Sequence, residues 1–217
     1  MDLPHSATGD VGRAAVLIPL RSLGSSKARL GDVLTLSERV VLIETMAERV
    51  ISAAHDLDVL VVHDDPNVEM WATGRGAMAI QAETPGLNNA ITEGREYLRA
   101  AGYSRLIIAH ADLPYAADLR VMLTAHEISI APDRHRDGTN VLSLSTTTPF
   151  DFAYGPGSFE NHVQIARDRG IEPFVVDLPG LSWDIDHPDD LPDDLTDFGL
   201  AHRQPSEKHT QPRGRPA

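Results

Sequence analysis

The sequence has 217 residues, and its 32 acidic side chains outnumber the 19 Lys and Arg, so the formal net charge is −13. This excess of negative charge argues against general binding to nucleic acids or anionic membranes, which requires a basic surface. The chain has no cysteine, which excludes disulfides, thiolate catalysis and cysteine-based zinc sites.

The length of the chain favours a single domain. Residues 1–12 lack the apolar stretch of a signal peptide, and the apolar runs are too short for a membrane span. We therefore expect a cytoplasmic protein with a flexible N-terminus at 1–12 and one folded domain at 13–200. The tail at 201–217 combines three prolines with scattered charge, a composition typical of disorder.

Three continuous apolar runs predict the central strands: Ala14–Leu20, Asp58–His63 and Arg105–His110. Runs of this kind are typical of strands that are buried on both faces, as in a parallel sheet covered by helices. Weaker strands are predicted at Ala77–Gln81, Ile128–Ala131, Asn140–Ser145 and Pro173–Asp177.

Helices are expected between these strands. Thr35 and Glu38 have the spacing of a capping box at the start of a helix over Ser37–Ala54. Further helices are predicted over Asn88–Ala101, Tyr115–His126 and Ser158–Arg169, the last ended by Gly170. The alternation predicts an α/β fold with a mainly parallel sheet, in which ligands bind beyond the carboxyl ends of the strands.

The loop after the first strand is the first candidate binding element. It carries Arg21, Lys27 and Arg29 among serines and one glycine. Exposed backbone N–H groups together with these cations could neutralise a triphosphate. The loop is neither a Walker A motif nor a G-x-G-x-x-G motif, and an ordinary basic surface loop is the alternative.

Three aspartates form a candidate metal site. Asp112 follows the strand that ends at His110, and Asp184 and Asp186 alternate with apolar residues near the C-terminus. In an extended segment these two carboxylates share a face, and they repel each other unless a cation lies between them. Mg²⁺ favours such ligands together with phosphate oxygens.

The alternatives are that Asp112 is a turn or cap residue and that the C-terminal aspartates are solvated. We assign the later acidic residues to the surface of a last short helix: Asp189, Asp190, Asp193, Asp194 and Asp197.

Three further loops could present polar groups to a ligand. Thr139 lies in a turn before a strand, and Ser158 follows a Gly-Pro-Gly turn at the start of a helix, where an anion could bind. Asn88 opens another helix and could contact a base or a ribose. Each of these residues could instead be a plain turn or cap residue.

In chain order, the motifs are PL-x(6)-KARL, GLNNAI, ADLP, DGTN, FAYGPGSFENH and DIDHPDDL. This set, which spans residues 14–195, resembles the CofC/FbiD family, the guanylyltransferases of coenzyme F420 biosynthesis. The resemblance implies a single-domain, Rossmann-like nucleotide-diphospho-sugar transferase fold with helices on both faces of the sheet. It also implies transfer of GMP from GTP to a small phosphoacid, with release of pyrophosphate. The phosphoacid would be 2-phospho-L-lactate, phosphoenolpyruvate or 3-phospho-D-glycerate.

The resemblance also implies roles for individual residues. Lys27 and Arg29 would act catalytically on the GTP phosphates. The nucleotide would also contact Leu20, Asn88 and Asp112, the Mg²⁺ ligands would be Asp112, Asp184 and Asp186, and the phosphoacid would contact Thr139, Gly155 and Ser158. A homodimer is compatible with the family.

The sequence departs from the family pattern at three positions. Ala111 stands where many relatives have Gly, His187 where Thr is usual, and Arg21 where Lys is frequent. Two alternative functions remain. One is a related nucleotidyltransferase with molybdopterin or a sugar phosphate as acceptor, although a molybdopterin enzyme would be expected to carry two glycines before the arginine. The other is a nucleotide-binding regulator without catalysis.

Overall fold

The computed structural model describes residues 12–23 and 27–200. The predicted disordered tail at 201–217, and all but the last residue of the predicted flexible N-terminus at 1–12, lie outside the described residues. Within them, no helix has both the length and the apolar character that crossing a membrane requires.

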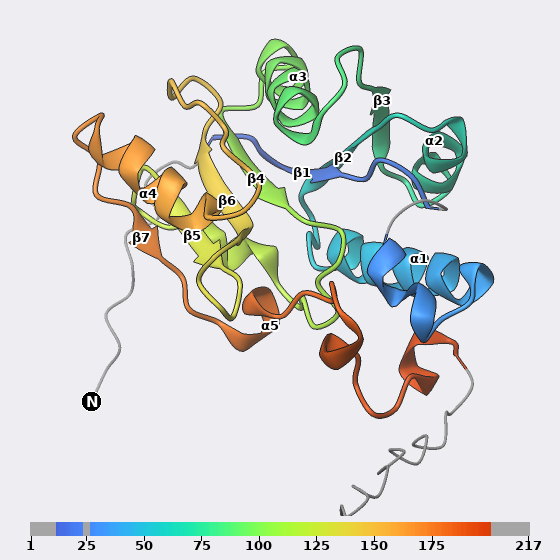
Figure 1. The fold of residues 1–217 in the computed structure, drawn as a ribbon. Coiled ribbons are helices and arrows are strands. Elements are labelled where there is room, and N and C mark those ends of the chain that lie inside the picture. Colours follow the sequence, from blue (N-terminus) through green and yellow to red (C-terminus); the bar gives the residue numbers. More distant parts are fainter. Residues whose placement is uncertain (1–11, 24–26, 201–217) are drawn as a thin grey trace, which may run out of the picture.

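One sheet of seven strands forms the centre of the described chain, in the order β3-β2-β1-β4-β6-β5-β7 (Figure 1). The strands are β1 (Ala14–Pro19), β2 (Asp58–His63), β3 (Met78–Gln81), β4 (Arg105–Ala109), β5 (Ser129–Pro132), β6 (Thr139–Ser145) and β7 (Phe174–Val175). Only β6 runs antiparallel to its neighbours. The predicted mainly parallel sheet is therefore confirmed, and each predicted strand is present.

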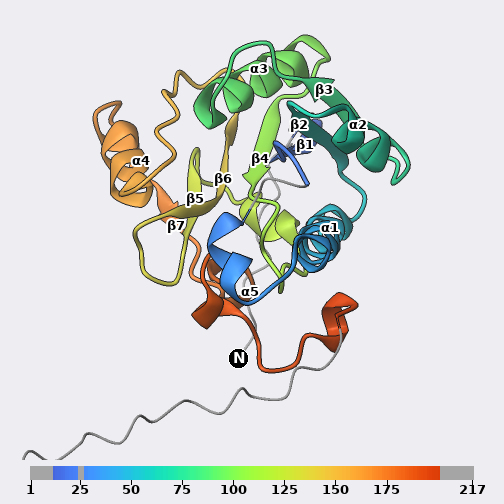
Figure 2. The ribbon, with the colours of Figure 1, turned by 45° about the vertical axis from the view of Figure 1, so that its right-hand side comes forward.

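Helices cover both faces of the sheet, as Figures 1 and 2 show. The helices are α1 (Leu36–Ser52), α2 (Pro66–Thr73), α3 (Leu87–Ala100), α4 (Ser158–Arg167) and the short α5 (Pro179–Ser182). Short 3-10 turns lie at Ala28–Asp32, Leu119–Met122, Pro188–Asp190 and Thr196–Phe198. One apolar core lies between the sheet and α1 with α2, and a second between the sheet and α3 with α4.

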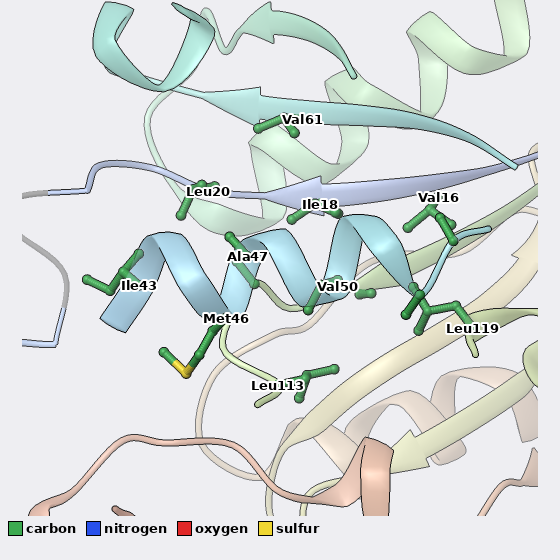
Figure 3. Close-up of a cluster of buried hydrophobic side chains, with 14 of the residues drawn as sticks. Val16, Ile18, Leu20, Ile43, Met46, Ala47, Val50, Val61, Leu113 and Leu119 are labelled. Atoms are coloured by element: carbon green, nitrogen blue, oxygen red, sulfur yellow. The ribbon is translucent and has the colours of Figure 1, made fainter. Parts of the chain in front are cut away.

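Helix α1 packs along β1 and β2 through one apolar face (Figure 3). Ile43, Met46 and Val50 lie on that face and are buried against strand residues such as Ile18 and Val61. Full burial of a side chain of this size contributes about 1.5–3 kcal/mol. The predicted capping box at its start is confirmed, since the Glu38 N–H donates to Thr35 Oγ1 at 3.3 Å and the Thr35 N–H donates to Glu38 Oε2 at 2.8 Å.

On the opposite face of the sheet, α3 lies close to the strands at Gly94, where a side chain would not fit without a shift of its neighbours. A Cβ atom at Gly94 would lie 2.4 Å from Leu17 Cδ1 and 2.7 Å from Val62 Cγ2. The absence of a side chain at this position lets the helix pack directly on β1 and β2, and so fixes where its N-terminus lies relative to the sheet edge.

One predicted helix differs from the structure. The helix predicted over Tyr115–His126 is wrong, because only the 3-10 turn at Leu119–Met122 forms there. Asp118 caps this turn by accepting from the Arg120 N–H at 2.9 Å, and the Leu119 N–H donates to the Ala53 carbonyl beyond α1. These bonds satisfy the backbone without a helix.

Helix α2 was not predicted. Its signal is nevertheless present in the sequence, because Asp65 caps the helix and Pro66 occupies its first turn.

The strand order brings the candidate loops together. β1 and β4 are parallel neighbours, so the loop containing Lys27 and the loop containing Asp112 leave the same edge of the sheet. The later segment with Asp184 and Asp186 joins them, since the Ile185 N–H donates to the Asp112 carbonyl at 3.3 Å.

Candidate active site

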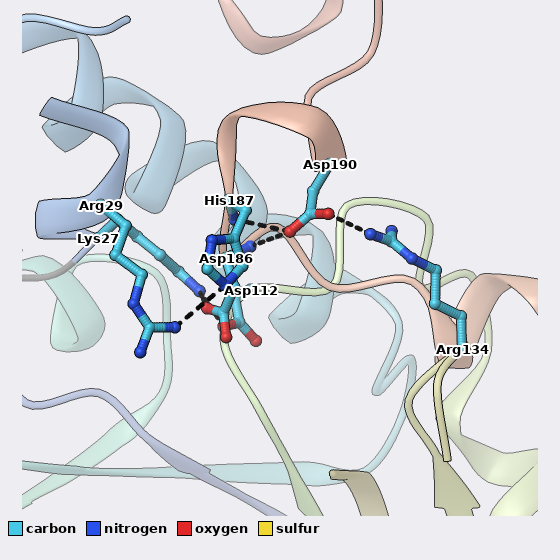
Figure 4. Close-up of polar contacts among 7 residues, drawn as sticks. All are labelled: Lys27, Arg29, Asp112, Arg134, Asp186, His187 and Asp190. Carbon is cyan, nitrogen blue, oxygen red and sulfur yellow. Dashed lines mark hydrogen bonds and ion pairs between the residues drawn. The ribbon is translucent and has the colours of Figure 1, made fainter. Parts of the chain in front are cut away.

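Lys27 connects the three predicted loops (Figure 4). Its ammonium group forms ion pairs with Asp112 and with Asp186 Oδ1, the latter at 2.5 Å. The residue has left-handed backbone angles (φ 58°, ψ 41°) just before the first 3-10 turn, and its side chain is only 11% exposed. One buried cation therefore bridges two carboxylates that lie 74 positions apart in sequence (186 − 112).

Lys27 and Asp112 stabilise each other's charged forms. Burial alone would lower the pKa of Lys27, but Asp112 and Asp186 together raise it above its ordinary value. Burial would likewise raise the pKa of Asp112, and the Lys27 ammonium holds it below its usual range. Both groups are therefore charged at neutral pH.

Asp184 lies near the same charges, but its surroundings disfavour its ionised form. Burial, Asp112 and Asp186 raise the pKa of Asp184 to about 6. The second oxygen of Asp112, Oδ1, is buried and has no hydrogen-bond partner. Asp112 thus offers a buried oxygen without a partner, and Asp184 is repelled by Asp112 and Asp186. Carboxylates in this arrangement are chemically suited to bind a hard cation.

The predicted metal ligands are not arranged as a ready-made metal site. In the part of the chain that the structure describes, no three His, Cys, Asp or Glu side chains form a group able to hold a metal ion. The cation between Asp112 and Asp186 is instead the ammonium of Lys27.

A cavity of about 480 Å³ opens beside Lys27. Its cationic wall holds Arg21, Lys27 and Arg29, and its acidic groups are Asp112 and Asp186. The rest of the lining is formed by Pro19, Leu20, Ala28, Ile43, Met46, Leu87, His110 and Ala111. The cavity combines a charged end with an apolar wall, and its volume is in the range of small-molecule sites.

The two arginines of the loop differ in their contacts. Arg21 donates to Asp64 Oδ2 at 3.0 Å in an exposed ion pair. Arg29 is exposed and donates to His187 Nε2 at 3.2 Å. Because an arginine only donates, His187 Nε2 must be the accepting nitrogen.

The structure separates Asn88 from the other predicted nucleotide contacts. Its amide nitrogen donates to the Tyr154 carbonyl at 3.3 Å, and its amide oxygen accepts from the Tyr154 N–H at 2.8 Å. The side chain therefore joins the start of α3 to the segment before α4. The neighbouring Leu87, rather than Asn88, lines the cavity.

Thr139 and Ser158, two of the three predicted phosphoacid contacts, lie together at the junction of β6 and α4. Ser158 Oγ accepts from the Thr139 N–H at 2.9 Å, and both residues are buried. Gly155 lies in the turn just before Ser158 and has φ 133°, a conformation that favours glycine. None of the three lines the 480 Å³ cavity.

A buried histidine orients this second group. His162 Nε2 accepts from the Ala153 N–H at 3.0 Å, so the proton of the neutral ring lies on Nδ1, which contacts Thr139 Oγ1 at 2.9 Å. Burial, with a contribution from His110, lowers the pKa of His162 to about 4, which keeps the ring neutral. Thr139 Oγ1 therefore accepts from His162, and its own hydrogen is available for another acceptor.

Asp190 supports the site, although the sequence predicts that it lies on the solvated surface. That assignment is wrong, because Asp190 is 5% exposed and its carboxylate accepts from the N–H groups of Asp186 and His187 and from Arg134. Burial alone would raise the pKa of Asp190, and these donors outweigh it and lower the pKa. The available signal was the position of Asp190, three residues after His187 and two after Pro188, which is the pattern of a capped turn.

Comparison with known proteins identifies related sequences. A sequence model of the family described as "Guanylyl transferase CofC like" matches residues 14–198. A phosphoenolpyruvate guanylyltransferase of Sphaerobacter thermophilus is 36% identical, over 81% of this chain and 89% of the relative. One from Rubrobacter xylanophilus is 38% identical, over 81% and 90%. A 2-phospho-L-lactate guanylyltransferase of Methanocaldococcus jannaschii is 31% identical, over 81% and 80%.

Solved structures with a similar fold are more distant in sequence. A Desulfovibrio desulfuricans G20 protein, assigned as a nucleotide-diphospho-sugar transferase, has a TM-score of 0.69 at 15% identity, with 81% and 83% of the two chains covered. A nucleotidyl transferase of Methanothermobacter has a TM-score of 0.59 at 19% identity, with 82% and 94% covered. Glucosyl-3-phosphoglycerate synthase of Mycobacterium tuberculosis, in complex with Mg²⁺ and UDP, has a TM-score of 0.52 at 16% identity, with 78% and 70% covered. These likenesses establish the fold.

Proposed function

This chain belongs to the family of CofC-like guanylyl transferases and is a nucleotidyltransferase, and we propose that it transfers GMP from GTP to a phosphorylated three-carbon acid. Pyrophosphate is the second product. Phosphoenolpyruvate is the acceptor to test first. The phosphoenolpyruvate guanylyltransferase of Rubrobacter xylanophilus is 38% identical to this chain, whereas the 2-phospho-L-lactate guanylyltransferase of Methanocaldococcus jannaschii is 31% identical.

The observation that carries this proposal is the Lys27 ammonium at the charged end of the cavity. In a chain of net charge −13, a triphosphate needs a local concentration of cations. Lys27 and Arg29 provide it on one wall of the cavity. They would bind the β- and γ-phosphates and stabilise the charge of the departing pyrophosphate.

The reaction requires little covalent participation by the protein. An oxygen of the acceptor phosphate forms a bond to the α-phosphorus of GTP, and the bond from that phosphorus to the bridging oxygen breaks. The electron pair leaves with pyrophosphate. Because a phosphate monoester is largely ionised near neutral pH, no general base is needed, and alignment of the two substrates dominates the rate.

Asp112, Asp184 and Asp186 are the residues that would hold Mg²⁺. The unpartnered Oδ1 of Asp112 supports a cation here, as do the burial of Asp184 and its repulsion by Asp112 and Asp186, which raise the pKa of Asp184. When bound, Mg²⁺ would supply charge neutralisation to the phosphate oxygens. Lys27 favours the ionised form of Asp112 and holds Asp112 and Asp186 side by side.

Thr139, Gly155 and Ser158 would contact the phosphoacid. Thr139 Oγ1 and Ser158 Oγ each accept a hydrogen bond from the protein, which leaves their hydroxyl hydrogens to donate to an anion. This polarity suits a phosphate or carboxylate acceptor. Because GTP and such acids are cytoplasmic metabolites, we place the enzyme in the cytoplasm.

A pyrophosphate-release assay tests the function. Wild-type protein is supplied with Mg²⁺ and GTP or ATP, and with phosphoenolpyruvate, 2-phospho-L-lactate or 3-phospho-D-glycerate in turn. Release is expected with GTP and one of the acids, and is expected to fall to background in Asp112→Asn or Asp184→Asn. The matched control is Asp189→Asn, since Asp189 is exposed. GTP binding without turnover for every acid would contradict the proposal and favour a regulator.

A further inference from the structure

Asp190 differs from the acidic residues around it. Asp189, Asp193 and Asp197 are exposed, whereas the Asp190 side chain is 8% exposed. A buried carboxylate is costly unless it is paired and hydrogen-bonded. The contacts of Asp190 therefore show which groups of the protein it holds in place.

The Asp190 carboxylate binds two consecutive backbone N–H groups of the proposed site. Oδ2 accepts from the Asp186 N–H at 2.8 Å and from the His187 N–H at 2.6 Å (Figure 4). Two donors on one oxygen fix the orientation of both peptide groups. The directions in which the Asp186 and His187 side chains leave the backbone are thereby fixed as well.

Those two side chains contact two of the three cations of the cavity wall, Lys27 and Arg29. Asp186 Oδ1 lies 2.5 Å from Lys27 Nζ, and His187 Nε2 accepts from Arg29 at 3.2 Å. Asp190 does not line the cavity. It therefore sits one layer behind the groups that would contact the nucleotide, on the side away from the cations.

Arg134 anchors the carboxylate from the sheet. This residue lies in the turn between β5 and β6, its N–H donates to the Ser182 carbonyl at 2.8 Å, and its guanidinium pairs with Asp190 Oδ1. The guanidinium carbon lies 4.2 Å from the centre of the Trp183 ring. The Trp183 indole in turn donates to the Asp190 carbonyl at 3.1 Å.

We propose that Asp190, anchored by Arg134, is a positioning residue that aims Asp186 and His187 at Lys27 and Arg29. The inference rests on the proposed function for its effect on the reaction. Asp190 would not contact the substrates, but it would set the alignment on which the transfer depends. A misplacement of about 1 Å in such a site lowers the rate about 100-fold.

The test compares Asp190→Asn with Asp189→Asn in the full chain. An Asn amide has a single oxygen, so it satisfies either the two N–H groups or Arg134. The expected kcat per folded molecule for pyrophosphate release falls about 10- to 100-fold in Asp190→Asn, and stays at the wild-type value in Asp189→Asn. A role in stability alone would lower Tm and leave that kcat unchanged.

A second readout does not depend on catalysis. In ¹H–¹⁵N spectra, the amide signals of Asp186 and His187 are expected to shift upfield in Asp190→Asn and not in Asp189→Asn, because their carboxylate acceptor is altered. If Asp190→Asn does not fold, Arg134→Gln takes its place, with a smaller fall in kcat expected. Unchanged amide signals, or equal kcat values in the two aspartate variants, would overturn the inference. A wild-type protein that turns over none of the acids would overturn the proposed function, and the spectra would still test the positioning.

Discussion

The two ends of the proposed site are built on different physical principles. The end near β1 and β4 is ionic, with the Lys27 ammonium between Asp112 and Asp186. The end at the junction of β6 and α4 is neutral, with the Thr139 and Ser158 hydroxyls oriented by backbone groups and by His162. The difference suggests a division of work, in which charge binds the triphosphate and fixed hydroxyl donors select the acceptor.

The largest expected effect is at the ionic end. Lys27→Ala removes a charge that would contact the phosphates and leaves Asp112 and Asp186 to repel each other. We expect kcat for pyrophosphate release to fall about 100- to 1,000-fold. The control is Arg99→Ala, whose side chain forms an exposed pair on α3, and which is expected to retain wild-type kcat. A Lys27→Ala enzyme within about 10-fold of the wild type would show that the ionic end does not govern the rate.

The free energy of unfolding is expected to depend on pH through His162 at the neutral end. The pKa of His162 is about 4 in the folded protein and 6.5 when unperturbed. Between these values the unfolded chain binds more protons at His162, so the contribution of His162 to the free energy of unfolding increases as pH rises through this window and decreases as pH falls. The contribution is at most roughly 3 kcal/mol.

Urea unfolding at several pH values between 4 and 7 measures this dependence. The slope of the free energy of unfolding against pH is expected to be lower in His162→Asn than in the wild type, and unchanged in His126→Asn, a substitution at an exposed histidine. If His162→Asn keeps the wild-type slope, then the ring is not held neutral by burial.

Thr139→Val tests whether the neutral end selects the acceptor. The variant keeps the shape of the side chain and removes the hydroxyl donor, so KM for the phosphoacid is expected to rise about 10-fold, and KM for GTP is expected to stay within about 2-fold. Thr139→Ser retains the hydroxyl and serves as the matched control. Equal increases in both KM values would show that the two ends are not separate in function.

His187→Thr is expected to have the smallest effect. His187 accepts from Arg29 at an exposed position, and exposed contacts of this kind contribute about 0–1 kcal/mol. The expected change in kcat/KM for GTP is less than about 5-fold. A change as large as that of Lys27→Ala would place His187 in direct contact with the reacting groups.

Much of the fold could be predicted because the signals are local. The apolar runs of β1, β2 and β4 and the capping box of α1 follow from short-range periodicity and hydrogen bonding. The absence of a helix at 115–126 could not be predicted in this way. It depends on a bond from Leu119 to Ala53, which is a contact between distant parts of the chain.

The candidate site shows the same limit. The position of Asp112 after a strand, and the alternation of Asp184 and Asp186, indicated that these residues belong to a site. The sequence could not show that Lys27 lies between two of them. Asp190 was missed for a related reason, because a run of aspartates is typical of a solvated surface, and its partner Arg134 lies 56 positions away.

The most direct measurement follows the transferred group itself. Wild-type protein is incubated with Mg²⁺, GTP labelled at the α-phosphorus and one of the three candidate acids at a time, and the products are separated and quantified. With one of the acids, we expect the label to move to the phosphoacid in a phosphorus–oxygen–phosphorus linkage, with one pyrophosphate released for each guanylylated acid. Label that stays in GTP, or that appears only as free GMP, with each of the three acids would contradict the proposed function.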